Sequence, residues 1–122
     1  MKPRSVSIPV PNAILFIQDP SIWDLPEPVD NAGIWATSSG ITLSCLHEQE
    51  GNTNITMGSM SEISPTHHLI FDGYLDSPDH RIVLQIVPGE IIFEQKVQGS
   101  RAHVKIWTDG SRWPGKVVVG VD

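Results

Sequence analysis

The stretch RIVLQIVPGEIIFEQKVQGSRAHVKIWT, residues 81–108, decides the fold class. Apolar and polar side chains alternate in it over three short runs, 81–87, 91–97 and 102–108. An alternation with a period of two puts successive side chains on opposite faces of a β-strand, whereas an amphipathic helix has a period of 3.6 residues. Proline and glycine residues separate the runs and favour turns. The stretch therefore predicts consecutive short β-strands.

Similar runs extend this pattern over the rest of the chain. We expect further strands at 6–10, 13–18, 33–37, 41–46, 55–60, 67–75 and 117–121. Ser38, Ser39 and Gly40 would join two of them into a hairpin, and the turn at 76–80 would pair 67–75 with 81–87. The prediction is an all-β fold, a two-layer antiparallel β-sandwich of about eight to ten short strands. It forms a single domain spanning residues 1–122.

The cysteine count and the hydropathy limit the disulfides, the metal sites and the compartment that the sequence allows. Cys45 is its one cysteine, so an intrachain disulfide and a cysteine-based zinc site are excluded. Its place on an apolar strand face predicts a small buried side chain. Pro9, Pro11 and Pro20 interrupt the N-terminal region, and no apolar stretch reaches the length of a membrane span. We therefore expect a cytoplasmic protein.

Charge is distributed unevenly along the chain. The net formal charge is −6, but no Lys or Arg occurs between Ser5 and His80, where ten acidic residues give a net charge of −10. From Arg81 onward, six basic residues stand against four acidic ones, a net charge of +2. The first two-thirds should therefore project a negative potential, which repels nucleic acid and anionic membranes and attracts basic proteins. The alternative is that these acids only aid solubility.

The longest predicted loop concentrates this acidity. Residues 19–31, DPSIWDLPEPVDN, hold three prolines and four acids, which excludes a helix interior or a central strand. Loops of this length are typically functional or mobile, and Trp and Arg dominate binding hot spots. The candidate partner-binding residues are Asp19, Trp23, Asp24, Glu27 and Asp30 of the loop, Asp72, Asp76 and Asp79 near the turn at 76–80, and Arg112 and Trp113 before the last strand.

The titratable side chains form no catalytic or metal-binding pattern. His67 and His68 are adjacent on a predicted strand and point to opposite faces, and Asp72 lies about 13 Å along the strand from His68. A metal site assembled across strands stays open at this level. No G-x-S-x-G turn, phosphate-binding loop or basic environment for a cysteine is present. We expect no catalytic residue, no metal, no cofactor and no enzymatic activity.

Tryptophans support further interpretations. Trp35 is expected in the core. Trp107, on the polar face of a strand, and Trp113, in a loop, are candidate stacking platforms, so the alternative function is a carbohydrate- or small-ligand-binding module. A third interpretation is an oligomer whose edge strands pair between subunits.

The order of elements from Gly33 onward carries a family resemblance. A strand ending in Ala-Thr precedes SSGITLS at 38–44, and HHLIFDGYLDSPDHRIVLQIV follows at 67–87. PGEIIFEQKVQGSRAHVKIW at 88–107 and a final valine-rich strand complete the order. It resembles the competence protein J family, bacterial inhibitors of a DNA-entry nuclease, in which the two longer segments would be a long hairpin and the next strand pair. The short, basic loop at 109–115 departs from that pattern.

The resemblance implies an inhibitor or immunity protein that blocks a nuclease or toxin. A nuclease active site is basic because it binds phosphates, so an acidic surface can occupy it or steer association toward it. The expected partner is a basic protein, contacted without direct binding to nucleic acid or membrane. The oligomeric state is left open.

Overall fold

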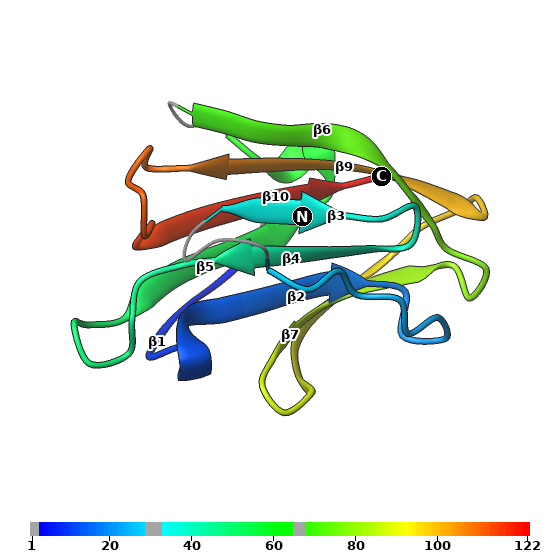
Figure 1. The fold of residues 1–122 in the computed structure, drawn as a ribbon. Coiled ribbons are helices and arrows are strands. Elements are labelled where there is room, and N and C mark those ends of the chain that lie inside the picture. Colours follow the sequence, from blue (N-terminus) through cyan, green and yellow to red (C-terminus); the bar gives the residue numbers. More distant parts are fainter. Residues whose placement is uncertain (1–2, 29–32, 65–67) are drawn as a thin grey trace.

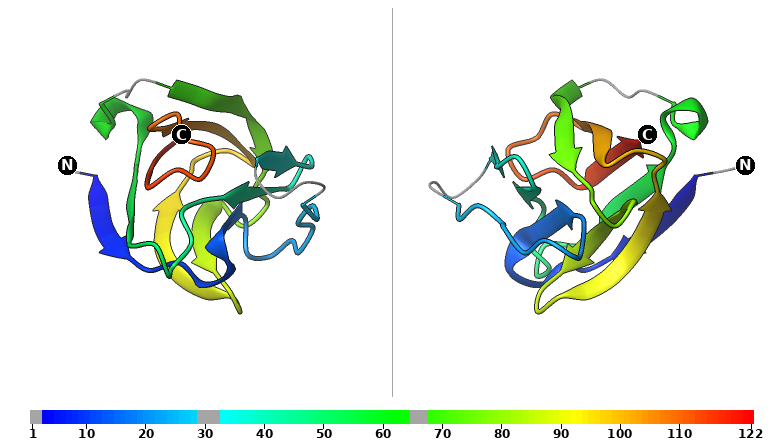
Figure 2. Two further views of the ribbon diagram at one scale, coloured as in Figure 1. Left: turned by 60° about the vertical axis from the view of Figure 1, so that its left-hand side comes forward. Right: turned by 90° about the vertical axis from the view of Figure 1, so that its right-hand side faces the viewer.

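The computed structural model describes residues 3–28, 33–64 and 68–122 and has two five-stranded β-sheets. They stack as two layers (Figures 1 and 2). The first sheet, in spatial order, contains β1 (Arg4–Ile8), β5 (Thr53–Gly58), β10 (Lys116–Val121), β9 (Arg101–Thr108) and β6 (His68–Asp76). The second contains β3 (Ile34–Ala36), β4 (Gly40–Ser44), β2 (Ile14–Gln18), β7 (Arg81–Ile86) and β8 (Glu90–Lys96). Short 3-10 helices, η1 (Pro11–Ala13) and η2 (Met60–Glu62), complete the described elements. The all-β sandwich prediction is confirmed.

Alternate side chains of the strands meet between the sheets and form the core. Ile106 of β9 is fully buried and lies opposite Val119 of β10 and Phe71 of β6. Leu15 and Ile17 of β2 are also fully buried and enter the same core from the second sheet. Removing such side chains from water stabilises the fold by roughly 25 cal/mol for each Å² of apolar surface. The period-two alternation of the sequence is therefore the pattern that builds the core.

One strand pair departs from the predicted antiparallel arrangement. β5 and β10 are parallel, with Ile55 opposite Val117 and Met57 opposite Val119. Parallel neighbours need a long connection, and here it contains η2 and the strands β6 to β9. Alternation of side chains is the same in both orientations, so the sequence pattern did not distinguish them.

Two predicted pairings are wrong. β6 pairs with β9, whereas β7 pairs with β2 and β8, so the segments 67–75 and 81–87 belong to different sheets. β8 and β9 are likewise in different sheets, although the family resemblance paired them. The hairpin of β3 and β4 is confirmed.

The two turns that cross between the sheets explain this difference, because they bond to each other. The backbone N–H of Ser77 donates to the carbonyl of Ser100 at 2.7 Å, and that of Val97 donates to the carbonyl of His80 at 2.9 Å. Each turn thus provides hydrogen-bond partners for backbone groups of the other turn. In a hairpin, these groups would pair with the strand that returns from the same turn. Proline, aspartate and glycine predict a turn at these places but not the sheet to which the chain returns.

We expect Ile106→Ala to lower the free energy of unfolding by about 2–5 kcal/mol, because it leaves a cavity between the two sheets. Urea denaturation measures the change. Lys116→Ala, at the exposed first residue of β10, is the control and should change stability by less than about 0.5 kcal/mol. Equal effects of the two substitutions would contradict the placement of the core.

Candidate functional site

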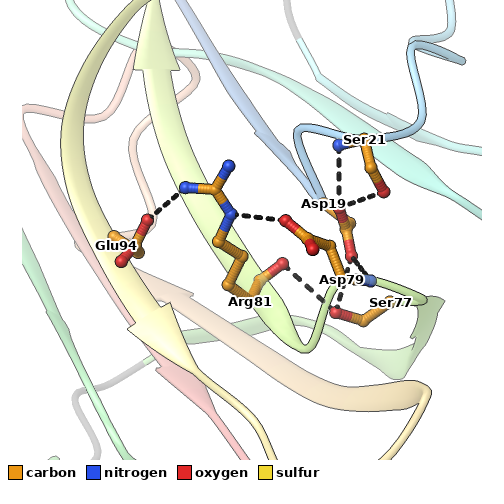
Figure 3. A network of polar contacts seen from close by, with 6 residues as sticks. All are labelled: Asp19, Ser21, Ser77, Asp79, Arg81 and Glu94. Atoms are coloured by element: carbon orange, nitrogen blue, oxygen red, sulfur yellow. Dashed lines mark hydrogen bonds and ion pairs between the residues drawn. The ribbon is translucent and has the colours of Figure 1, made fainter.

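The segment that follows β2, residues 19–28, begins at a buried carboxylate, and we call this segment the strap. Asp19 has a relative exposure of 0%. One of its oxygens accepts hydrogen bonds from the backbone N–H and the hydroxyl of Ser21, at 2.8 and 2.6 Å. The other accepts from the hydroxyl of Ser77 at 3.0 Å and the backbone N–H of Asp79 at 2.8 Å (Figure 3). A single carboxylate thus ties the strap to the turn between β6 and β7.

The prediction that Asp19 is a surface contact is therefore wrong. Burial raises the pKa of Asp19, but the hydrogen bonds from Ser21, Asp79 and Ser77 outweigh burial and leave the pKa below its ordinary value. The ionised form is the one that accepts all these bonds. Asp19 positions the site and does not belong to its surface.

The strap then runs across the outer face of the β3–β4 hairpin. The Thr37 hydroxyl donates to the carbonyl of Asp24 at 3.0 Å, and the Thr42 hydroxyl donates to the carbonyl of Pro26 at 2.7 Å. A Cβ atom on Gly40 would lie 2.7 Å from the carbonyl oxygen of Asp24, so the strap passes too close for any side chain at that position. These contacts hold the strap backbone in one path over the second sheet.

The strap exposes three of the predicted partner-binding residues. Trp23 has a relative exposure of 65%, and Asp24 and Glu27 are also exposed. Neither carboxylate forms a hydrogen bond or ion pair with another residue that the structure describes. A Cβ atom on Gly89, in the turn between β7 and β8, would lie 3.9 Å from the Trp23 ring. Asp30 lies outside the described residues, and its role stays a prediction.

The second acidic group is spread along β6 and the turn after it. Asp72, in the middle of β6, lies 2.6 Å from Nε2 of His103 and 4.0 Å from Nζ of Lys105, both on β9. Asp76 ends the strand, is half-buried and accepts a 3.5 Å hydrogen bond from Ser39. Asp72 and Asp76 are about 13 Å apart along the strand, so they do not form one cluster.

Asp79, the third member, belongs to an ion-pair chain. It contacts Arg81 at 2.8 Å, and Arg81 contacts Glu94 at 2.6 Å (Figure 3). The two carboxylates hold the pKa of Arg81 above its ordinary value, with the hydrogen bond that Arg81 donates to Glu94 as the largest cause. All three side chains are partly exposed, so the pairs stabilise the fold little. They also neutralise part of the acidity of this turn.

Arg112 and Trp113 lie in the loop between β9 and β10 and have different surroundings. Arg112 is exposed and lines an apolar groove of about 250 Å³ with Ile34 of β3 and Ile70 of β6. Trp113 is half-buried, and its ring centroid lies 4.6 Å from that of His47. Trp113 and Pro28, the last described residue of the strap, line a common hollow.

The other tryptophans differ from expectation. Trp107 is only 8% exposed and packs with Ile63 and Val118 on the outer face of the first sheet, so its prediction as a stacking platform is wrong. Trp35 is half-buried instead of in the core, because it lies opposite Thr42 on the outer face of the second sheet. The segment around η2 covers Trp107, a contact that strand alternation did not predict.

The described residues show no sign of metal or thiol chemistry. Among residues 3–28, 33–64 and 68–122, no group of His, Cys, Asp and Glu side chains is placed to hold a metal ion. Cys45 is buried, which confirms its prediction, and burial raises its pKa to about 11. No helix in these ranges is long and apolar enough to cross a membrane.

Sequence reasoning missed the residues that hold the strap in place. Ser21 had a local signal, because a hydroxyl two residues after an aspartate commonly closes an Asx-type turn. Ser77, Thr37 and Thr42 had no local sequence signal, since each lies in a turn or strand outside the strap. Only the folded chain brings them to the strap.

Comparisons with known proteins find one solved structure with a similar fold. No protein-family model and no curated protein matches the chain. Among solved structures, the chain is similar to ComJ from Bacillus subtilis, described as an inhibitor of the DNA-degrading activity of NucA. The TM-score is 0.61 at 10% sequence identity, over 99% of this chain and 94% of ComJ. The resemblance to the competence protein J family is thereby confirmed at the level of the fold.

We expect Asp19→Asn to lower the free energy of unfolding at neutral pH by about 2–3 kcal/mol, because an amide nitrogen faces donors that bonded to the carboxylate. The pKa of Asp19 in the folded protein lies below its ordinary value. The contribution of Asp19 is therefore fully present above its unfolded pKa and is lost as the pH falls through the folded pKa. Urea titrations should show the difference between the two proteins shrinking in that acidic window.

Asp24→Asn makes the same change at an exposed position and should alter stability by less than about 0.5 kcal/mol. A stability difference between the wild type and Asp19→Asn that stays constant into strong acid would contradict an ionised Asp19 in the folded state.

Cys45 should react with a thiol reagent only after unfolding, because it is buried and its pKa of about 11 leaves it protonated at neutral pH. Reaction with a chromogenic disulfide, followed with and without urea, measures this. Rapid labelling of the folded protein would show that the chain after β4 opens readily and would contradict the burial of Cys45.

Proposed function

We propose that the chain is a cytoplasmic inhibitor or immunity protein that binds a basic nuclease or toxin through its strap. The observation that carries the proposal is an exposed tryptophan followed by two exposed acids on an anchored backbone, formed by Trp23, Asp24 and Glu27. The fold likeness to a nuclease inhibitor supports the proposal. A blocking role does not require catalytic groups on this chain.

The anchoring of the strap favours tight binding. A free loop loses conformational entropy when it binds, whereas Asp19, Thr37 and Thr42 already hold the strap backbone in place. A large exposed indole on such a backbone has the character of a hot-spot anchor. Trp23 would enter an apolar depression of the partner, and the adjacent carboxylates would contact its basic rim.

Charge pairing makes the strap a stronger candidate than the second acidic group. Asp72 and Asp79 already face basic side chains of the C-terminal half. Asp24 and Glu27 have no such partner among the described residues. Their field is therefore available for steering a basic partner, an effect that weakens as salt increases.

We expect the double substitution Asp24→Asn and Glu27→Gln to weaken nuclease binding about 10- to 100-fold at low salt and to flatten its salt dependence. Trp23→Ala should weaken binding by about 30-fold or more, the loss typical of a hot-spot residue. Binding and inhibition would be measured with NucA as the first target, by calorimetry and by DNA degradation.

Two further variants separate the effect of charge on nuclease binding from the effect of strap geometry. Glu48→Gln with Glu50→Gln removes the same charge from the exposed turn after β4 and should leave binding nearly unchanged. Gly40→Ala alters no charge but displaces the strap, so it should weaken binding. Strap variants that inhibit as well as the wild type would refute the strap as the contact surface. A failure to inhibit any bacterial nuclease would refute the function itself.

A further inference from the structure

One end of the sandwich carries a feature that Trp23, Asp24 and Glu27 do not line. Two adjoining hollows of about 200 and 190 Å³ share Asn12, Ala13 and His47 in their linings. Trp35 and Trp113 line the first hollow. Glu48 and Gln49 line the second. We call the two together the aromatic hollow.

Backbone hydrogen bonds hold the walls of the aromatic hollow together. The N–H of Cys45 donates to the carbonyl of Ala13, and the N–H of Leu46 donates to the carbonyl of Pro114, both at 2.9 Å. The segment after β4 is therefore bonded to η1 on one side and to the β9–β10 loop on the other. The elements that carry Asn12, His47 and Trp113 thus form one connected wall.

Asp109 braces the loop that carries Trp113. Its carboxylate accepts hydrogen bonds from the backbone N–H groups of Ser111 at 2.9 Å and Gly115 at 3.1 Å. Burial raises the pKa of Asp109, but the hydrogen bonds from Ser111 and Gly115 outweigh burial and lower the pKa below its ordinary value. An ionised Asp109 therefore spans the base of the loop. Trp113 is held before any ligand arrives, which reduces the entropy lost on binding.

The rim of the hollow contains strained backbone. Asn12 and Ala13 have φ angles of 58° and 56°, in the left-handed region that non-glycine residues rarely adopt. Each such residue costs on the order of 1 kcal/mol. Backbone strain of this kind concentrates at binding sites, where it aims a side chain. The exposed Asn12 amide forms no hydrogen bond with another described residue, so it is available to a ligand.

We propose that the aromatic hollow binds one neutral pyranose ring. Indole faces pack against the C–H face of a sugar, and amide, imidazole and carboxylate groups can bond to its hydroxyls. At roughly 30 Å³ for each water-sized group, each hollow accommodates on the order of six heavy atoms, the size of one pyranose ring without its substituents. No described Lys or Arg lines either hollow, and Glu48 disfavours anions. Pro28 of the strap lines the first hollow, whereas Trp23, Asp24 and Glu27 line neither hollow, so sugar binding can be tested without a nuclease.

The test is a titration of the isotope-labelled full chain with glucose, galactose, mannose and N-acetylglucosamine, followed by the NMR signals of the tryptophan indole N–H groups. We expect at least one sugar to move the signals of Trp35 and Trp113 saturably, with a Kd on the order of 1 mM. The signals of Trp23 and Trp107 should not move, because neither residue lines the hollow.

Asn12→Gly gives the sharpest variant, because glycine adopts the left-handed conformation without strain while the amide is removed. Its stability should be unchanged or higher, and sugar affinity should fall about tenfold. Trp113→Ala should cause a similar loss, Trp113→Phe should retain part of the affinity, and Trp23→Ala is the control with unchanged sugar affinity.

Three results would overturn the proposal. The first is the absence of saturable shifts with every sugar. The second is wild-type sugar affinity in both Asn12→Gly and Trp113→Ala. The third is movement of the Trp35 and Trp113 signals by a short proline peptide but by no sugar, which would mark the hollow as a site for polyproline segments.

Discussion

The buried carboxylate of Asp19 is the interaction on which the arrangement of the surface depends. It accepts hydrogen bonds from Ser21 in its own segment and from Ser77 and Asp79 in a turn far along the chain. That turn is one of the two that cross between the sheets and bond to each other. The ionised carboxylate of Asp19 therefore links the start of the strap to the turn between β6 and β7. A buried carboxylate is tolerated only where hydrogen-bond donors surround it, so Asp19 can be buried only when the turn that holds Ser77 and Asp79 lies beside it.

Pairing with basic side chains determines which acidic residues still project a negative field into the solvent. The acidic and basic parts of the sequence are separate along the chain, but the fold brings β6 beside β9, and Arg81 follows Asp79 by two residues where the two parts meet. Asp72 and Asp79 consequently meet His103 and Arg81. No basic side chain that the structure describes pairs with Asp24 or Glu27 of the strap, so the field of these two acids stays intact.

The strap and the loop that carries Trp113 are both held in place by the sandwich, and both are proposed to bind. In both, hydrogen bonds to backbone groups hold a loop that displays tryptophan: Thr37 and Thr42 hold the segment of Trp23, and Asp109 holds that of Trp113. The ComJ-like fold supplies the frame. Loops fixed on a frame in this way bind with little further ordering, which is the physical advantage of placing function on anchored loops.

The sequence by itself determined the strands, because period-two alternation follows directly from the geometry of an extended backbone. It indicated the burial of Cys45 and the inward face of β9, where Ala102, Val104 and Ile106 are fully buried. Only the tertiary structure decided that β5 and β10 are parallel, that the turn after Asp76 crosses between sheets, and that Asp19 points inward. It also covered Trp107 with the η2 segment and left Trp35 half-buried on the outer face. The reason is that strand orientation, sheet membership and the partners of a carboxylate depend on residues distant in the chain, and local patterns carry no information about them.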